Sequence, residues 1–141
     1  MLVRLANSDA DIQQCFAVMV QLRSHLTSAT FMTMVKRQAQ QSGYRLAFLE
    51  DADEVKAVAG FRITEMLSKG RFLYLEDLVT DISDRSQGYS SILFDWLVEY
   101  AKQNDCNQLE LDCGVQRINA HRFFFRKRMF VGSYHFSIRI Q

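Results

Sequence analysis

The six residues Arg85–Ser90, which read Arg-Ser-Gln-Gly-Tyr-Ser, have the composition and setting of an anion-binding loop. A strand-like apolar segment, residues 71–80, precedes them, and residues 91–103 repeat apolar side chains at the spacing of an amphipathic helix. A short loop between a strand and a helix leaves backbone N–H groups unpaired at the positive end of the helix dipole. With Gly88 near its end, such a loop is typical of phosphate binding.

The loop matches neither of the two best-known phosphate-binding motifs. A Walker loop requires Gly-x-x-x-x-Gly-Lys-Ser/Thr and a dinucleotide loop requires Gly-x-Gly-x-x-Gly, whereas this loop has a single glycine, three residues after Arg85. It resembles instead the pyrophosphate loop Arg/Gln-x-x-Gly-x-Gly/Ala of the GNAT superfamily of N-acetyltransferases. Ser90 departs from the usual final Gly or Ala. The alternative interpretation of residues 85–90 is an ordinary surface turn that happens to contain an Arg and a Gly.

A second segment strengthens the resemblance. Residues 119–130 read Asn-Ala-His-Arg-Phe-Phe-Phe-Arg-Lys-Arg-Met-Phe and are similar to the GNAT segment Asn-x-x-Ala-x-x-Phe-Tyr-x-x-x-Gly-Phe. They follow a predicted strand, residues 108–113, as the order of that family requires. The resemblance, which spans residues 73–140, implies an acetyl-CoA-dependent N-acetyltransferase with a GNAT fold.

The resemblance also implies which residues hold acetyl-CoA. Backbone N–H groups along the loop would bind the pyrophosphate, and Gly88 would let the backbone approach it closely. Asn119 would bond the pantetheine arm or the phosphate region, and backbone N–H groups near Leu78 to Thr80 would stabilise the thioester carbonyl where family members splay two strands. The predicted cofactor contacts are Leu78, Val79, Thr80, Arg85, Ser86, Gln87, Gly88, Tyr89, Ser90, Asn119 and Phe124.

Two adjacent carboxylates, Glu76 and Asp77, are the candidates for deprotonating the amine. An alkylammonium has a pKa near ~10, so few molecules are nucleophilic at neutral pH without a base. Alternation along the strand places Glu76 on one face and Asp77 on the other, and either could act directly or through a water. The alternative is that one carboxylate simply pairs with Arg62 or Arg71.

The second segment departs from the GNAT pattern at two positions. The family has a Tyr, near the sulfur as a general acid, where this chain has Phe124, which cannot donate a proton. General acids typically contribute about 10²–10⁴-fold. A thiol of pKa near ~8.5 can nevertheless leave as a thiolate, and Tyr134 or a water could substitute. Arg128 stands where the family often has Gly, and this change could distort the helix exit.

These side chains need a sheet and helices to position them. Ser8 is an N-cap candidate for a first helix, and Gly43 is a plausible left-handed end for a second helix over residues 30–41. The predicted strands are 1–6, 44–49, 55–66, 71–80, 108–113 and 130–140, and the later helices are 88–103 and 117–128. The order β-α-α-β-β-β-α-β-α-β indicates an α/β domain around one mixed sheet. The resemblance implies the same order, with a mostly antiparallel sheet flanked by helices.

Composition favours a single domain over residues 1–141. Apolar residues make up 48% of the chain, with 11 Phe, which excludes a disordered or fibrous protein. We expect no membrane span and no signal peptide, because no run of 18 apolar residues and no charged-then-apolar leader occurs. The three cysteines show neither disulfide nor metal-ligand spacing. We therefore expect a cytoplasmic protein without a metal.

Charge is unevenly distributed although the net charge is only +1. Residues 114–141 hold six Lys or Arg and no acid, while residues 1–113 hold 11 basic and 16 acidic groups. A basic end suits an anionic ligand, and an acidic remainder suits a cationic one. Nucleic acid is the rival ligand for the basic end, but nucleic-acid-binding domains are usually strongly basic or carry a docking motif.

We therefore predict an enzyme that moves an acetyl group from acetyl-CoA to a primary amine, with no membrane or nucleic-acid partner. Glu76, Asp77 and Tyr134 are the predicted catalytic residues. The alternative is a GNAT-fold sensor or interaction module that binds acyl-CoA with weak or no catalysis, and Phe124 motivates it. The amine stays open, and a homodimer is possible because dimers are common in the family.

Overall fold

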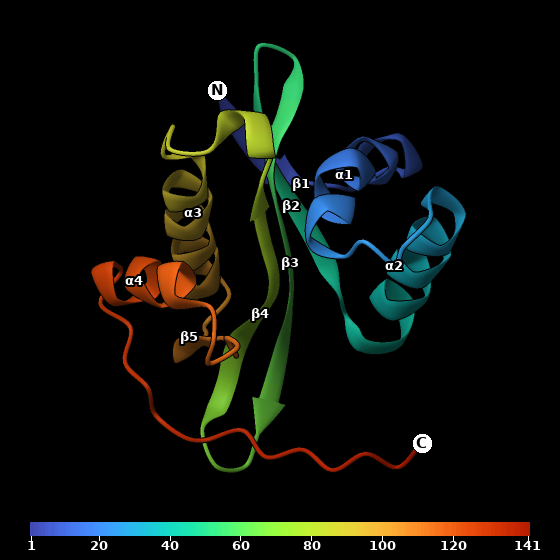
Figure 1. The fold of residues 1–141 in the computed structure, drawn as a ribbon. Helices are drawn as coiled ribbons and strands as arrows, with labels where there is room; N and C mark the ends of the chain where they lie inside the picture. Colours follow the sequence, from blue (N-terminus) through green and yellow to red (C-terminus); the bar gives the residue numbers. More distant parts are fainter. The chain divides into compact units, whose positions relative to one another are not determined.

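The computed structural model describes all 141 residues of the chain. Two compact units are present, residues 1–110 and residues 111–141. The first unit holds the sheet and three α-helices, and the second holds one α-helix (Figure 1). None of the helices combines the length and the apolar character that crossing a bilayer requires.

Five strands of the first unit form one sheet in the order in which they occur along the chain. They are β1 (Leu2–Leu5), β2 (Arg45–Asp51), β3 (Glu54–Met66), β4 (Gly70–Thr80) and β5 (Gln108–Glu110). All neighbours are antiparallel except β4 and β5, which are parallel and pair only from Phe72 with Gln108 to Tyr74 with Glu110. Residues 75–80 of β4 therefore run on beyond the parallel pairing.

Helices cover both faces of the sheet (Figure 1). α1 (Asp9–Leu22) and α2 (Ser28–Ser42) lie on one face, and α3 (Tyr89–Gln103) lies on the other. The side chain of Ser8 accepts a hydrogen bond from the N–H of Asp11 and caps α1, as expected. Gly43 ends α2 with φ of 73°, also as expected.

Each face has its own apolar core. Under α1 and α2, residues such as Met19, Phe31 and Phe48 are almost completely buried. On the other face, the ring of Phe61 packs edge-on against Tyr100 of α3, with 5.5 Å between centroids. Burial of these two apolar surfaces holds the helices against the sheet and makes the sheet a fixed platform for the residues at its ends.

A β-bulge in β4 interrupts the alternation of side chains. Phe61 pairs with Leu75 and Gly60 pairs with Asp77, so Glu76 is the extra residue. Leu75 shares the α3 face with Phe61, whereas Asp77 bonds Arg23 at the end of α1, and Glu76 bonds Arg62. The Arg62 side chain also reaches α2. The predicted placement of the two carboxylates on opposite faces is therefore wrong, because the bulge brings both to the face of α1 and α2.

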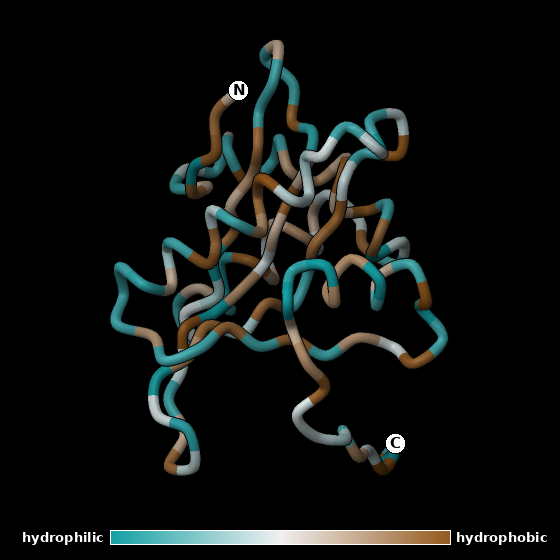
Figure 2. Tube along the Cα trace, turned by 90° about the vertical axis from the view of Figure 1, so that its left-hand side faces the viewer, coloured by the Kyte–Doolittle hydropathy of each residue, from teal (hydrophilic) through white to brown (hydrophobic).

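The second unit contains α4 (Ile118–Arg126) and no strand, so the predicted final strand over residues 130–140 is not formed. A strand needs a neighbouring strand to bond its backbone groups, and alternation of apolar residues alone does not supply one. Figure 2 shows apolar and polar positions interspersed along this segment. Its large apolar side chains are exposed: Phe130, Val131, Tyr134, Phe136, Ile138 and Ile140. Strand β5 likewise ends at Glu110 rather than at residue 113.

Candidate functional site

The predicted anion-binding loop lies between the end of β4 and the start of α3, after a 3₁₀ turn at Ile82–Asp84. Arg85, Ser86, Gln87 and Gly88 are exposed. Ser86 and Gly88 have φ of 72° and 80°, and no side chain caps the start of α3. The first N–H groups of this helix are therefore free of a capping side chain, as an anion site requires.

The last two residues of the loop segment tie it to the sheet. The hydroxyl of buried Tyr89 donates to Asp51 Oδ2 at 3.0 Å, and this hydrogen bond is the main cause of a raised Tyr89 pKa. Ser90 and Thr80 are joined by a hydrogen bond between their hydroxyls. Ser90, at the position where Gly or Ala was expected, thus connects the start of α3 to the end of β4.

Glu76 is held by a guanidinium that is itself anchored. Arg62 donates from Nε and Nη2 to both oxygens of the Glu76 carboxylate, with 3.0 Å between Nη2 and Oε1. The same guanidinium donates to Ser42 Oγ at 2.7 Å and to Gln38 Oε1 at 3.0 Å, both on α2. The hydrogen bond with Glu76 is the main cause of a raised Arg62 pKa. For Glu76, the predicted alternative of pairing with Arg62 is what the structure shows.

Asp77 has a different set of partners. Arg23 Nε donates to its Oδ1 at 2.8 Å, and the Tyr44 hydroxyl donates to its Oδ2 at 2.7 Å. Burial, and then the charge of Asp77, raise the pKa of Tyr44 well above its usual value. A Cβ on Gly60 would lie 1.8 Å from the Tyr44 oxygen, so only glycine leaves room for this contact. Asp77 therefore sits between a buried hydroxyl and a surface guanidinium.

The three residues that follow the carboxylates pair with β3 on one side and have no paired strand on the side of β5. Leu78 and Thr80 are partly buried and Val79 is buried. None of the three lies within the stretch of β4 that pairs with β5. Both carboxylates, the end of β4 and the loop before α3 thus follow one another within residues 76–90 of the first unit.

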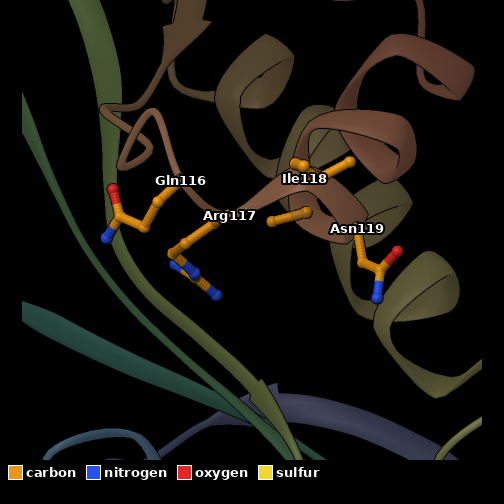
Figure 3. A pocket seen from close by; sticks show the side chains of 5 residues that line it. Gln116, Arg117, Ile118 and Asn119 are labelled. Carbon is orange, nitrogen blue, oxygen red and sulfur yellow. The ribbon is translucent and has the colours of Figure 1, made fainter.

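The second unit has a pocket at the start of α4, lined by Gln116, Arg117, Ile118, Asn119 and Ala120. In Figure 3 the polar ends of Arg117 and Asn119 point downward from the start of α4, whereas the amide of Gln116 points to the left, away from them. Arg117 is the N-cap residue, and no side chain caps this helix. The predicted cofactor residue Asn119 therefore belongs to a polar pocket beside an uncapped helix start.

Phe124 and Arg128, the two residues that depart from the GNAT pattern, lie at the end of α4. Phe124 packs edge-on against Phe123, with 5.4 Å between ring centroids. The N–H of Met129 bonds Phe124 O and the N–H of Arg128 bonds Phe125 O, and Arg128 has φ of 67°. These bonds form a Schellman motif. The expected distortion of the helix exit is therefore absent, because Arg128 takes the left-handed conformation of the usual glycine.

Tyr134, the third predicted catalytic residue, lies in the segment after α4 and is 85% exposed. It belongs to the second unit, whereas Glu76 and Asp77 belong to the first. Its part in the chemistry stays a prediction.

Sequence reasoning missed Arg23, Tyr44 and Gly60. Arg23 lies 54 positions from Asp77 and Tyr44 lies 33 positions away, so no local spacing signals either contact. The available signals were indirect: Arg23 falls near the end of the predicted first helix, and Tyr44 follows the glycine that ends the second. Neither signal points to a carboxylate on a strand.

Similar proteins extend these observations. The sequence profile of the Acetyltransferase (GNAT) family matches residues 13–129. An uncharacterized N-acetyltransferase, YhdJ of Bacillus subtilis, is 31% identical over 117 residues, which cover 83% of this chain and 82% of that protein.

Solved structures share the fold at lower identity. A transcriptional regulator from Bacillus halodurans C-125 superposes with a TM-score of 0.86 at 19% identity and covers 99% of each chain. An aminoglycoside N-acetyltransferase in complex with CoA superposes with a TM-score of 0.87 at 11% identity, over 98% of this chain and 93% of that chain.

Proposed function

Because this chain belongs to the GNAT family of acetyltransferases, we propose that it moves an acetyl group from acetyl-CoA to a primary amine. The family and the GNAT fold, both expected from the sequence, are confirmed. The main support for acetyl-CoA as the cofactor is the exposed loop between β4 and α3, which leads into a helix start without a capping side chain. A neighbour of the same fold was solved in complex with CoA, which supports the choice of an acyl-CoA.

The loop supplies the donors for the pyrophosphate. Backbone N–H groups of residues 85–90 would bond its oxygens, and the positive end of the α3 dipole would favour its charge. The positive φ values of Ser86 and Gly88 support this role, because they turn the backbone sharply beside an exposed helix start. Asn119, in the pocket at the start of α4, would bond the pantetheine arm or a phosphate.

The strand end supplies the donors for the reacting carbonyl. We propose that the backbone N–H groups of Leu78 and Thr80, which alternate along β4 with the β3-facing N–H of Val79, polarise the thioester oxygen and stabilise the negative charge that develops on it when the amine attacks. Their position beyond the β4–β5 pairing supports this role, because a backbone edge without a partner strand can bond a ligand.

Of the two carboxylates, Asp77 suits the amine better. Both oxygens of Glu76 accept from one anchored guanidinium, so its role in the proposal is to fix β4 to α2 through Arg62. Asp77 has one oxygen bonded to a surface side chain and directly precedes the strand end proposed for the thioester. Its carboxylate would bind the amine and accept a proton, directly or through a water.

The leaving thiolate departs either unaided or with a proton from Tyr134 or a water. Unaided departure is chemically reasonable, because the thiolate of a thiol with pKa near ~8.5 is a weak base that can leave before it takes up a proton. The second candidate function, an acyl-CoA-binding module with weak or no catalysis, is favoured by Phe124 at the position of the family's tyrosine. A homodimer and a cytoplasmic location stay predictions.

Two measurements test the proposal. Acetyl-CoA should raise the melting temperature, and at a concentration about 100 times its Kd it should stabilise the fold by about 2.7 kcal/mol. Free thiol should then appear when amines are added, across a panel of amino acids, polyamines, aminoglycosides and peptides. Stabilisation without thiol release from any amine would favour the binding module, and no stabilisation would contradict both functions.

Substitutions at Gly88 test where the pyrophosphate binds. Gly88→Val should abolish the stabilisation by acetyl-CoA, because a β-branched residue cannot easily adopt φ of 80°. Gly88→Asn is the matched control, since Asn tolerates this conformation and no atom lies within 4 Å of the added Cβ. Equal responses of the two variants to acetyl-CoA would argue against this placement.

A further inference from the structure

The guanidinium of Arg23 occupies a pair of acceptors at the bulge of β4. Its Nε donates to Asp77 Oδ1 at 2.8 Å, and its Nη2 donates to the backbone oxygen of Glu76 at 3.0 Å. The Asp77 side chain is only 12% exposed, whereas that of Arg23 is 43% exposed. The cation therefore closes over a mostly buried carboxylate from the solvent side.

The two arginines at the bulge are held very differently. Arg62 donates to Glu76 and also to two residues of α2, and its side chain is partly buried. Arg23 follows the end of α1, and its side chain has no hydrogen bond other than the two to β4. An ion pair with a side chain this exposed is weak, so a competing cation can displace Arg23 much more easily than Arg62.

Asp77 is kept in place without Arg23. The buried hydroxyl of Tyr44 donates to Oδ2, which leaves Oδ1 as the oxygen for a second donor. Gly60 provides the space for the Tyr44 contact. If Arg23 moved away, Oδ1 of Asp77 and the oxygen of Glu76 would remain as two fixed acceptors, directly before Leu78.

We propose that Arg23 determines acceptor specificity by occupying the ammonium position in the free protein and yielding it to a cationic acceptor. The inference rests on the proposed function, and it adds that the amine binds as a cation, such as an alkylammonium, rather than as a neutral arylamine. An alkylammonium has three N–H donors, enough for both acceptors, and carries the charge that Asp77 requires in place of Arg23. The excess of acid over base in residues 1–113 attracts the same class of molecule.

A binding experiment that does not depend on turnover tests this role. Arg23→Ala should leave a vacant cation site, so methylguanidinium, at concentrations too low to denature, should raise its melting temperature relative to equal sodium chloride. The wild type should not respond, and neither should Arg23→Ala combined with Asp77→Asn. Arg37→Ala is the matched control, because it removes an exposed arginine of α2 that has no hydrogen bond to Asp77.

Kinetics supply the second test. If Arg23 fills the site about 80–90% of the time, its removal should lower the KM for the acceptor amine about five- to tenfold with little change in kcat. Arg23→Lys should keep the higher KM, because it retains a competing cation. Arg23→Gln provides a second charge-free variant of similar length should Arg23→Ala not fold.

The outcomes separate this inference from the proposed function. No response of either charge-free variant to methylguanidinium, or a raised KM in both, would overturn the role of Arg23. A methylguanidinium response without acetylation of any amine would uphold the cation site and reject the acetyl transfer. Acetylation with an unchanged KM and no methylguanidinium response would do the reverse.

Discussion

At the scale of single residues, the two carboxylates of β4 differ in what their oxygens are bonded to. Both oxygens of Glu76 accept from Arg62, which α2 holds in place. Asp77 shares its oxygens between the buried Tyr44 and the exposed Arg23. The first arrangement stabilises the fold, and the second leaves a carboxylate that a ligand can reach by moving one surface side chain.

Substitution of each carboxylate should therefore have a different effect. We expect Asp77→Asn to lower kcat/KM by about 100-fold or more, because it removes the proposed base and the charge that binds the amine. Glu76→Gln should instead destabilise the fold by about 1–2 kcal/mol, because Arg62 loses an ionic partner in a partly buried site. Steady-state kinetics and urea denaturation of both variants check this, and the opposite pattern would reverse the two roles.

Phe124 is the second position where a single side chain bears on the chemistry. If proton donation to the sulfur limits turnover, Phe124→Tyr should raise kcat by up to about 100-fold. Phe125→Tyr is the matched control, because it adds the same hydroxyl to the next residue of α4, whose ring is largely exposed. An unchanged kcat in Phe124→Tyr would mean that the thiolate leaves unaided.

At the scale of elements, the ends of strands and helices do most to shape the site. The bulge in β4 turns two consecutive carboxylates to one face, and the short β5 leaves the end of β4 without a parallel neighbour. The start of α3 has no capping side chain, so its donors are available to a ligand. Regular pairing or capping at any of these ends would consume groups that the proposed function requires.

The end of α4 gives a stability prediction. Arg128 is the left-handed residue of a Schellman motif, a conformation that costs roughly 1 kcal/mol for a residue with a Cβ. We therefore expect Arg128→Gly to stabilise the helix end by about 0.5–1 kcal/mol. Arg126→Gly, inside the last turn, should destabilise it by a similar amount. Thermal denaturation compares the two, and a loss of stability in Arg128→Gly would show that its side chain contributes more than its backbone costs.

At the scale of the whole molecule, the free energy of unfolding depends on pH through Tyr44. Its hydroxyl is buried and donates to Asp77, and both features raise its pKa in the folded state. The unfolded chain releases this proton above pH ~10, while the folded chain retains it. The unfolded state then binds fewer protons, so stability falls as pH rises.

Tyr44→Phe isolates this contribution. The variant should lose about 1–2 kcal/mol at neutral pH, because Asp77 loses a hydrogen bond. Its stability should then fall less steeply than that of the wild type above pH ~10, since it has no phenol to ionise. Urea denaturation over a series of pH values measures both slopes. Parallel slopes would mean that Tyr44 titrates alike in the folded and unfolded chains.

Local features of the chain were predictable from the sequence alone. Ser8 and Gly43 mark helix ends because a cap acts on the backbone a few residues away. The loop before α3 was recognisable for the same reason, since an apolar strand, a glycine and an amphipathic helix follow one another directly. The motifs at residues 85–90 and 119–130 then identified the family, which the family match confirms.

Only the tertiary structure decided the contacts that give these residues different roles. The register between β3 and β4 placed the bulge at Glu76, and the sequence of β4 alone contains no pattern that predicts it. Arg23 and Tyr44 meet Asp77 across long stretches of sequence, because α1, which Arg23 follows, packs on the sheet and Tyr44 directly precedes β2. The segment 130–140 alternates like a strand but has no neighbour to pair with. Capping and periodicity act over a few residues, whereas strand pairing and ion pairs depend on which distant segments the fold brings together.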